Sequence, residues 1–325
     1  TNRASTTIMG AYEFIPYISY DIQPYALVTP SSVVAKGIDE LVSFRLMNVG
    51  TTTITAASIN WSFNGVAQPV VNWSGSLTGG NSVVVVLDTV TPISGINNIV
   101  VYTSLPNDTV TFNDTLKVDL YGCDSMFNGM YTIGSGGNFS NIEDALSSIN
   151  KCGMNGPVTL ALLTGNYPPL SLSGSINGMN EINTITITSF AGNADSVLIG
   201  NTTTTGNALI LDRASHWIFK DVTIGMNSTY TRYAVELKGL CENVLFYGCK
   251  IQTYGNTTSS SYVGVRYQGD GSATTFLSNV RFIKNTIDGG YYNFYFNYAS
   301  GNNTPMQNRI TSMYIDSNIL TNAYY

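Results

Sequence analysis

The stretch that decides the fold runs from Asn243 to Ile251, reads NVLFYGCKI, and returns twice near the C-terminal end. Residues 279–287 read NVRFIKNTI and residues 312–320 read SMYIDSNIL, with a looser copy that starts at Trp217. Aligned on the first apolar residue, at 217, 244, 280 and 313, the copies are spaced by 27, 36 and 33 residues. A repeat of this length with short β-runs indicates a unit that buries its apolar face only by stacking on its neighbours.

Each copy carries apolar residues at offsets 0, 2 and 7 from its first apolar position. The change of phase after offset 2 predicts a bend between two strands, which is typical of one coil of a parallel β-helix. Offset 5 holds Val, Cys or Asn, and Asn285 and Asn318 both occupy it. An inward ladder of these asparagines would be structural.

The first third of the chain has a different pattern of short alternating strands with turn signals about every ten residues. Asn64-Gly65 is the strongest hairpin signal. The expected strands include residues 41–46, 58–63, 83–87, 98–103 and 115–120. This spacing predicts an immunoglobulin-like β-sandwich over residues 17–122.

The character changes near Tyr131, and a single convincing helix follows. Ser140 and Glu143 read as a capping box, and an apolar stripe through Ile142 and Ile149 has helical spacing. We expect a short helix near 140–151 that covers the open end of a β-helix over residues 123–325. Parallel crossovers are almost always right-handed, which predicts a right-handed β-helix. The fold class is therefore all-β apart from this capping helix.

Composition narrows the function classes. Of 325 residues, 43% are hydrophobic and only 10% are charged, with a net charge of −6 and no run of Lys or Arg. A nucleic-acid partner is not expected, because the basic footprint is absent. The longest apolar run, residues 83–87, is too short to enter a bilayer as a span. An uncharged polar surface suits a secreted protein in carbohydrate-rich surroundings.

The chain has four cysteines, and none has the C-x-x-C spacing of a zinc or redox motif. Two interpretations stay open, which are buried thiols and one or two disulfides in an exported protein. The natural pairs would be Cys123 with Cys152 and Cys241 with Cys249. The single histidine, His216, makes a metal site a poor interpretation, and we expect it to have a surface or stacking role.

Several phrases resemble the large exported surface proteins of Bacteroidetes, which alternate β-sandwich and β-helix modules. Residues 45–50, 59–66 and 113–115 resemble a CARDB-like immunoglobulin fold, and residues 129–167 resemble the opening of a pectate-lyase-like right-handed β-helix. Residues 9–14 look like the phrase that closes such a β-helix. The resemblance implies that residues 1–16 are the tail of a preceding β-helix, that 123–325 is an incomplete one, and that type IX secretion exports the protein.

The same resemblance suggests modification. An Asp followed by Ser or Thr and an apolar residue is similar to the O-glycosylation signal of this bacterial group. The candidate acceptors are Thr89, Thr109, Thr115, Ser125 and Ser196.

An enzymatic function has to be considered, because some polysaccharide lyases and glycoside hydrolases also have parallel β-helix folds. Either activity needs carboxylates that converge on one face. On the repeated stretch the charged residues are Lys220, Asp221, Lys250, Arg281, Lys284 and Asp316. Asp221 and Asp316 lie three copies apart, so they cannot share a metal or a sugar ring. We therefore predict no catalytic, cofactor-binding or metal-binding residues, with a carbohydrate-active or carbohydrate-binding β-helix as the alternative.

Tyrosines gather late in the chain at Tyr291, Tyr292, Tyr295 and Tyr298. They could form a packed wall of the β-helix or stack on sugar rings, and both interpretations stay open. The expected function is a non-enzymatic, structural or adhesive segment of a large extracellular cell-surface protein. Its expected partners are neighbouring modules of the same chain, and surface glycans or other cell-surface proteins.

Overall fold

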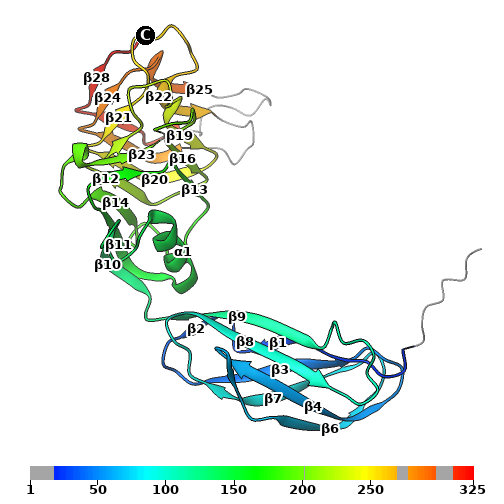
Figure 1. Ribbon diagram of the computed structural model, residues 1–325. Helices are drawn as coiled ribbons and strands as arrows, with labels where there is room; N and C mark the ends of the chain where they lie inside the picture. Colours follow the sequence, from blue (N-terminus) through cyan, green and yellow to red (C-terminus); the bar gives the residue numbers. More distant parts are fainter. Residues whose placement is uncertain (1–17, 201, 269–276, 298–309) are drawn as a thin grey trace, which may run out of the picture. The chain divides into compact units, whose positions relative to one another are not determined.

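The computed structural model describes residues 18–325 except position 201 and residues 269–276 and 298–309 (Figure 1). The chain divides into two compact units, Thr1–Ser125 and Met126–Tyr325. The division comes after the predicted boundary at residue 122, because strand β9 (Thr115–Cys123) pairs with the first unit as far as Cys123. The expected β-helix tail at residues 1–16 lies outside the described residues.

The first unit consists of two β-sheets. One sheet has the order β1-β3-β7 and the other β2-β9-β8-β4-β5, with β6 also paired to β4. Every pair is antiparallel except β2 with β9. Besides β9, the strands are β1 (Ile22–Thr29), β2 (Val33–Ala35), β3 (Glu40–Asn48), β4 (Ile54–Phe63), β5 (Val66–Ala67), β6 (Val71–Leu77), β7 (Ser82–Val90) and β8 (Gly95–Ser104).

One apolar core lies between the two sheets. It includes Phe44 from the first sheet and Trp61 and Ile99 from the second, all buried. Along β4 and β8 the buried residues around Trp61 and Ile99 alternate with less buried ones, which is the period-two pattern of a sheet with one buried face. The hairpin predicted at Asn64-Gly65 is confirmed between β4 and β5, and both turn residues have positive φ, of 49° and 78°.

The second unit is a stack of coils in three parallel sheets (Figure 1). The first sheet contains β10 (Phe127–Ile133), β11 (Met154–Leu162), β14 (Ile185–Ser189), β17 (Trp217–Lys220), β20 (Cys241–Tyr247), β23 (Leu277–Ile283), β26 (Ile310–Thr311) and β27 (Tyr314–Asp316). The second contains β12 (Gly165–Tyr167), β15 (Val197–Ile199), β18 (Thr223–Ile224), β21 (Lys250–Gln252), β24 (Thr286–Asp288) and β28 (Ile319–Thr321). The third contains β13 (Leu170–Ser173), β16 (Leu209–Asp212), β19 (Tyr233–Lys238), β22 (Val263–Gln268) and β25 (Tyr292–Asn297). A short 3₁₀ helix (Ala194–Ser196) precedes β15.

The repeated stretch sets the register between coils. Phe219 pairs with Phe246, Phe246 with Phe282, and Phe282 with Ile315, as the alignment of the copies predicts. The three phenylalanine rings stack, with centroids 5.0 and 4.7 Å apart and interplanar angles of 11° and 1°. Because the chain visits the three sheets in turn and each strand pairs in parallel with its counterpart one coil away, the arrangement fits a β-helix.

The bend predicted after offset 2 is built from residues with left-handed backbone. Asp221, Gly248, Lys284 and Ser317 share offset 4 and have φ of 51°, 64°, 57° and 56°. Each joins a strand of the first sheet to a strand of the second. Residues other than glycine rarely adopt this main-chain conformation. Its recurrence at offset 4 in four coils indicates that the stacking of the coils fixes the geometry of the turn.

Helix α1 (Ile142–Cys152) packs against β10 and β11 at the first coils (Figure 1). Its buried face is Ile142, Ala145 and Ile149, and these join the coil core. The sequence predicted Ser140 as the N-cap, which is one residue before the observed N-cap. Asn141 is the N-cap and accepts from the main-chain N–H of Asp144 at 2.8 Å, whereas the Ser140 hydroxyl donates to the Asp144 carboxylate at 2.9 Å. The Asn amide takes the capping position because its oxygen reaches the N–H three residues on.

Candidate functional site

A group of charged side chains on β19 and β22 of the third sheet is centred on Glu236. Glu236 is only 4% exposed. Its Oε1 lies 2.8 Å from Nη1 of Arg266, and its Oε2 lies 3.2 Å from Nζ of Lys238. Asn207 Nδ2 also donates to Oε2 at 2.7 Å. Both carboxylate oxygens therefore have partners, which offsets part of the cost of removing the carboxylate from water.

Strand register brings the members of this group together. Glu236 pairs with Arg266 across β19 and β22, and Arg266 pairs with Tyr295 across β22 and β25. The Arg266 guanidinium also lies over the Tyr233 ring, 4.5 Å from its centroid, in a cation–π contact.

Sequence reasoning missed this group, because it examined charged residues only on the repeated stretch. The sequence did contain a signal for this group, namely the alternation of apolar and charged residues along β19 and β22. Val235 and Leu237 are buried on either side of Glu236, and Val265 and Tyr267 are buried on either side of Arg266. The same alternating phase places the two charges side by side.

The charged residues of the repeated stretch do not converge. Lys220 heads a column that passes through Tyr247 and Ile283 to Asp316, three coils away. At about 4.8 Å per strand this is roughly 14 Å. Asp221 pairs locally with Lys220 at 3.8 Å. Lys250 pairs with Asp195, and the Lys284 ammonium lies 5.6 Å from the Tyr247 ring centroid.

The late tyrosines, for which a packed wall and sugar stacking were both left open, form a cluster that extends further than the sequence suggested. Tyr291, Tyr292 and Tyr295 are half-buried and contact one another in sequence, with centroid distances of 4.7 and 5.1 Å. Tyr324 and Tyr325 are 55% and 74% exposed and stack on or tilt against Tyr291 at 5.3 and 5.2 Å. We call these five residues the tyrosine cluster. Tyr298 lies outside the described residues.

The cysteines divide into two classes. Cys123 and Cys152 are disulfide-bonded. Cys241 and Cys249 are free and buried, so the disulfide suggested between them is wrong. Burial raises the pKa of Cys241 to about 11 and that of Cys249 to about 12. These thiols therefore stay protonated at neutral pH and act as small core side chains with weak hydrogen bonds.

The candidate O-glycosylation sites differ in access. Thr89, Thr109, Thr115 and Ser125 are exposed. Ser196 is half-buried, and its hydroxyl lies 2.7 Å both from the Ser189 hydroxyl and from the carbonyl of Asn193.

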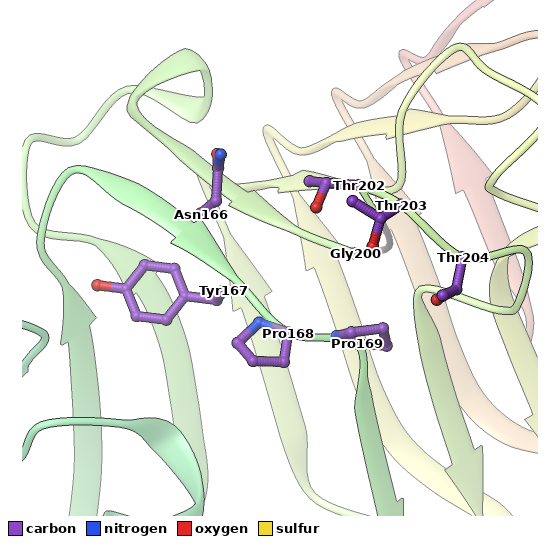
Figure 2. Close-up of a pocket in the computed structure, with 8 residues that line it drawn as sticks. All are labelled: Asn166, Tyr167, Pro168, Pro169, Gly200, Thr202, Thr203 and Thr204. Atoms are coloured by element: carbon purple, nitrogen blue, oxygen red, sulfur yellow. The ribbon is translucent and has the colours of Figure 1, made fainter.

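A hollow of about 320 Å³ lies where two neighbouring coils turn from the second sheet to the third (Figure 2). Figure 2 shows Pro168 and Pro169 on one turn and three threonines on the next. Its lining is Asn166, Tyr167, Pro168, Pro169, Gly200, Thr202, Thr203 and Thr204. No lining side chain is an acid or a base at neutral pH, so the hollow offers shape and hydroxyl groups and no acid–base pair.

In the described part of the chain, no three His, Cys, Asp or Glu side chains are grouped so that they could hold a metal ion. No helix among the same residues is long and apolar enough to cross a membrane.

Comparisons with known proteins give weak structural similarities. No protein-family model matches the sequence, and no curated protein matches it. The CARDB domain of a Pyrococcus furiosus protein, solved with di-metal ions, is 17% identical, with 33% of this chain and 90% of that chain covered and a TM-score of 0.27. A domain of a cell-surface protein from Methanosarcina acetivorans is 16% identical over 34% of this chain and 98% of its own, with a TM-score of 0.30.

A third similar structure is the catalytic domain of a GH87 α-1,3-glucanase in complex with nigerose. It is 10% identical, with 86% of this chain and 75% of that chain covered and a TM-score of 0.17. The CARDB-domain similarity extends over about a third of this chain. At TM-scores below 0.5, none of these similarities decides what the chain binds or whether it is an enzyme.

Proposed function

We propose that this chain is a structural, non-enzymatic segment of an extracellular surface protein, in which an immunoglobulin-like sandwich precedes a right-handed parallel β-helix. The observation that carries the structural role is the set of buried apolar columns that runs through successive coils. Ile199, Ile224, Ile251 and Ile287 form one such column, and all four are fully buried. Stacked coils of this kind make a rigid rod, since each coil buries its apolar face on the next.

The disulfide supports the extracellular location. Bonded cysteines at 123 and 152 persist only in an oxidising compartment in most organisms, whereas cytosolic thiols are kept reduced. Intact cells of the source organism, treated briefly with trypsin, should release peptides of this chain while a cytosolic marker stays inside. Peptides that appear only after lysis would contradict the surface location.

The non-enzymatic part of the proposal is supported by the charges. The buried carboxylate of Glu236 is engaged by Arg266 and Lys238, and Asp221 and Asp316 are separated along the stack. Hydrolysis by paired carboxylates needs the two groups within about 10 Å of each other. The protein should therefore release no reducing ends or unsaturated products from acidic or neutral polysaccharides, with or without calcium. Turnover that disappears in Glu236→Gln or Asp221→Ala would overturn this.

Glycan binding is the second candidate function, and the tyrosine cluster favours it. Tyr325 exposes 74% of its surface beside Tyr291 and Tyr292, so aromatic faces are available for sugar rings. Tyr325→Ala and Tyr292→Ala should each weaken retention on a glycan array, and a chelator should leave retention unchanged. Tyr102→Ala, which removes an exposed tyrosine of the sandwich, is the matched control. Equal loss in all three variants would exclude the cluster as the site.

The bacterial group, the export route and the glycosylation of this chain are also part of the proposal. The sequence resemblance supports a Bacteroidetes surface protein exported by type IX secretion and O-glycosylated. Mass spectrometry of protein from its native source should find glycans on the exposed acceptors Thr89, Thr109, Thr115 and Ser125. Ser196 should stay unmodified because its hydroxyl is engaged by Ser189 and Asn193.

A further inference from the structure

Strand β7 forms one edge of the three-stranded sheet in the first unit. It pairs with β3 on one side. In the described part of the chain, residues 82–90 make no hydrogen bond between main-chain groups outside this ladder. Because alternate residues of a strand direct their N–H and C=O groups to opposite sides, an edge strand presents a row of such groups to whatever lies beside it. The edge of β7 can therefore pair with a further strand.

The sequence of β7 lacks the features that usually protect an edge strand. Residues 82–87 read SVVVVL, with no charged residue, no proline and no glycine. Val84 and Val86 lie on the outer face and are 44% and 52% exposed, whereas Val85 is buried on the inner face. The ladder with β3 is regular as far as Val86 and shifts by one residue before Thr89. A regular edge of exposed β-branched residues favours pairing with another strand.

The other edges of the sandwich are protected. On β1, Pro24 has no N–H, the Asp108 carboxylate accepts from the N–H of Ile22 at 2.9 Å, and the ladder with β3 shifts twice. Strands β2 and β5 have only three and two residues. Strand β6 (VNWSGSL) contains asparagine, serine and glycine in place of a continuous apolar run. Among the described edges of the sandwich, β7 is therefore the long one without protection.

Two charged residues indicate what pairs with β7. Arg45 on β3 is exposed and lies beside Val84, and its Nη1 is 3.3 Å from Oγ of Ser82 near the start of β7. Asp88 is exposed near the end of β7. In the described part of the chain neither residue forms an ion pair. An antiparallel second copy of β7 would bring its own Asp88 beside Ser82 and thus beside Arg45, so the edge is complementary in charge to itself.

We infer that β7 is a self-association surface, on which the β7 strands of two copies pair antiparallel about a two-fold axis at Val85. This register places Val84 beside Val86 of the second copy, and Ser82 beside its Asp88. Each contact occurs twice because the interface is symmetric. The two three-stranded sheets would join into one continuous sheet, with cross-strand valine pairs on its outer face.

The pairing should be weak in dilute solution, because one strand pair buries much less than the roughly 1,600 Å² of a standard interface. It should strengthen where many copies are held side by side, since a high local concentration favours the second contact. Thr89, a candidate glycosylation site, lies beyond the paired segment of residues 82–88. The inference goes beyond the proposed structural role and does not rest on it, because it concerns the first unit alone.

The test is sedimentation velocity of the full chain between about 5 and 500 µM, over which the weight-average mass should rise by about 1.5-fold or more. Hydrogen exchange at the two concentrations should be slower in residues 82–88 at the higher one. Val84→Lys places a charge on the edge and should keep the chain monomeric. Val66→Lys, at a 64% exposed valine of β5, is the matched control and should associate as the wild type does. Circular dichroism checks that both variants are folded.

Charge reversal tests the antiparallel register. Arg45→Asp and Asp88→Arg should each weaken association about 10-fold, because two attractions become two repulsions. The double variant should restore it to within about 3-fold of the wild type, because the charges only exchange places. A double variant as weak as the single ones would exclude this register.

Three other results would overturn the inference. The first is a wild-type mass that stays constant over the whole concentration range. The second is association that Val84→Lys leaves unchanged, which would place the contact on another surface. The third is a monomer whose residues 82–88 are already protected from exchange, which would mean that another segment of the chain covers β7.

Discussion

The side-chain amide of Asn285 donates a 3.0 Å hydrogen bond to the main-chain carbonyl of Phe246 in the preceding coil. Its Oδ1 accepts from the N–H of Cys249 at 2.9 Å, so one side chain satisfies two main-chain groups that the bend leaves unpaired. Asn318 repeats the pattern one coil later, since its Nδ2 donates to the carbonyl of Phe282 at 2.8 Å and its Oδ1 accepts from the N–H of Asn285 at 2.9 Å. The asparagine ladder is thus part of how the coils turn.

Replacing Asn285 with Ala should therefore destabilise the second unit by about 2–4 kcal/mol, because two buried main-chain groups lose their partners. Urea unfolding followed by far-ultraviolet circular dichroism measures this. Asn155→Ala, at an exposed position on β11, is the control and should change the unfolding free energy by less than about 0.5 kcal/mol. Equal effects of the two substitutions would show that the ladder carries no stability.

Cys249 occupies the ladder position in the coil before Asn285. Its Sγ donates to the carbonyl of Phe219 at 3.3 Å, as Asn285 does to Phe246. Cys249→Asn should consequently be tolerated within about 1 kcal/mol, because an amide makes the same bond more strongly in a similar volume. Cys249→Leu, which keeps the site apolar but is larger and cannot donate, should cost more than 1 kcal/mol. Urea midpoints of the two variants decide this, and a leucine variant that matches the asparagine variant would contradict it.

The sandwich should gain stability on mild acidification. Burial, and then the negative charges of Asp108 and Asp21, raises the pKa of Asp114 from 3.8 to about 6 on folding, so the folded state binds more protons between these values. Stability therefore falls as pH rises from about 4 to 6 and levels off above that. The melting temperature of the first unit should be higher at pH 5 than at pH 7.5, and Asp114→Asn should flatten the dependence. An opposite slope in the wild type would show that Asp114 is not the controlling group.

The cap of α1 offers a separate test. Asn141→Ala should destabilise the helix by about 1 kcal/mol, since the N–H of Asp144 loses its acceptor. Ser140→Ala removes only a side-chain contact with Asp144 and should have a smaller effect. Hydrogen exchange of residues 142–146 in the two variants makes the comparison, and a larger effect at Ser140 would restore the capping box that the sequence predicts.

The coil register was predictable from sequence because the repeated stretch carries its own alignment. Phe246 and Phe282 occupy equal offsets, and identical side chains stack in parallel sheets. The bend was also predictable from the change of phase, but the left-handed backbone of Asp221 and Lys284 was not, since neither residue type requires it. The cap shifted from Ser140 to Asn141 because both residues are good caps and only the entry angle of the chain decides between them.

The site residues were harder to predict for a different reason. Glu236 and Arg266 come from coils 30 residues apart, and their contact depends on the register of a sheet outside the repeated stretch. The sequence predicted only part of the tyrosine cluster. It missed Tyr324 and Tyr325, which contact Tyr291 only because the last turn of the chain places them beside it.

The central claim is that consecutive copies of the repeated stretch pair in parallel and in register. Disulfide trapping tests it most directly, because Cα atoms more than about 7 Å apart cannot be bridged without backbone movement. Parallel pairing puts Ile218 beside Leu245 and Lys220 beside Tyr247, all at half-buried or exposed positions of the outer face. The double variants Ile218→Cys with Leu245→Cys, and Lys220→Cys with Tyr247→Cys, should therefore form disulfides on mild oxidation, as read by mass spectrometry of peptides. Bond formation instead in the crossed pairs, Ile218→Cys with Tyr247→Cys and Lys220→Cys with Leu245→Cys, would mean antiparallel pairing and contradict the stacked-coil fold.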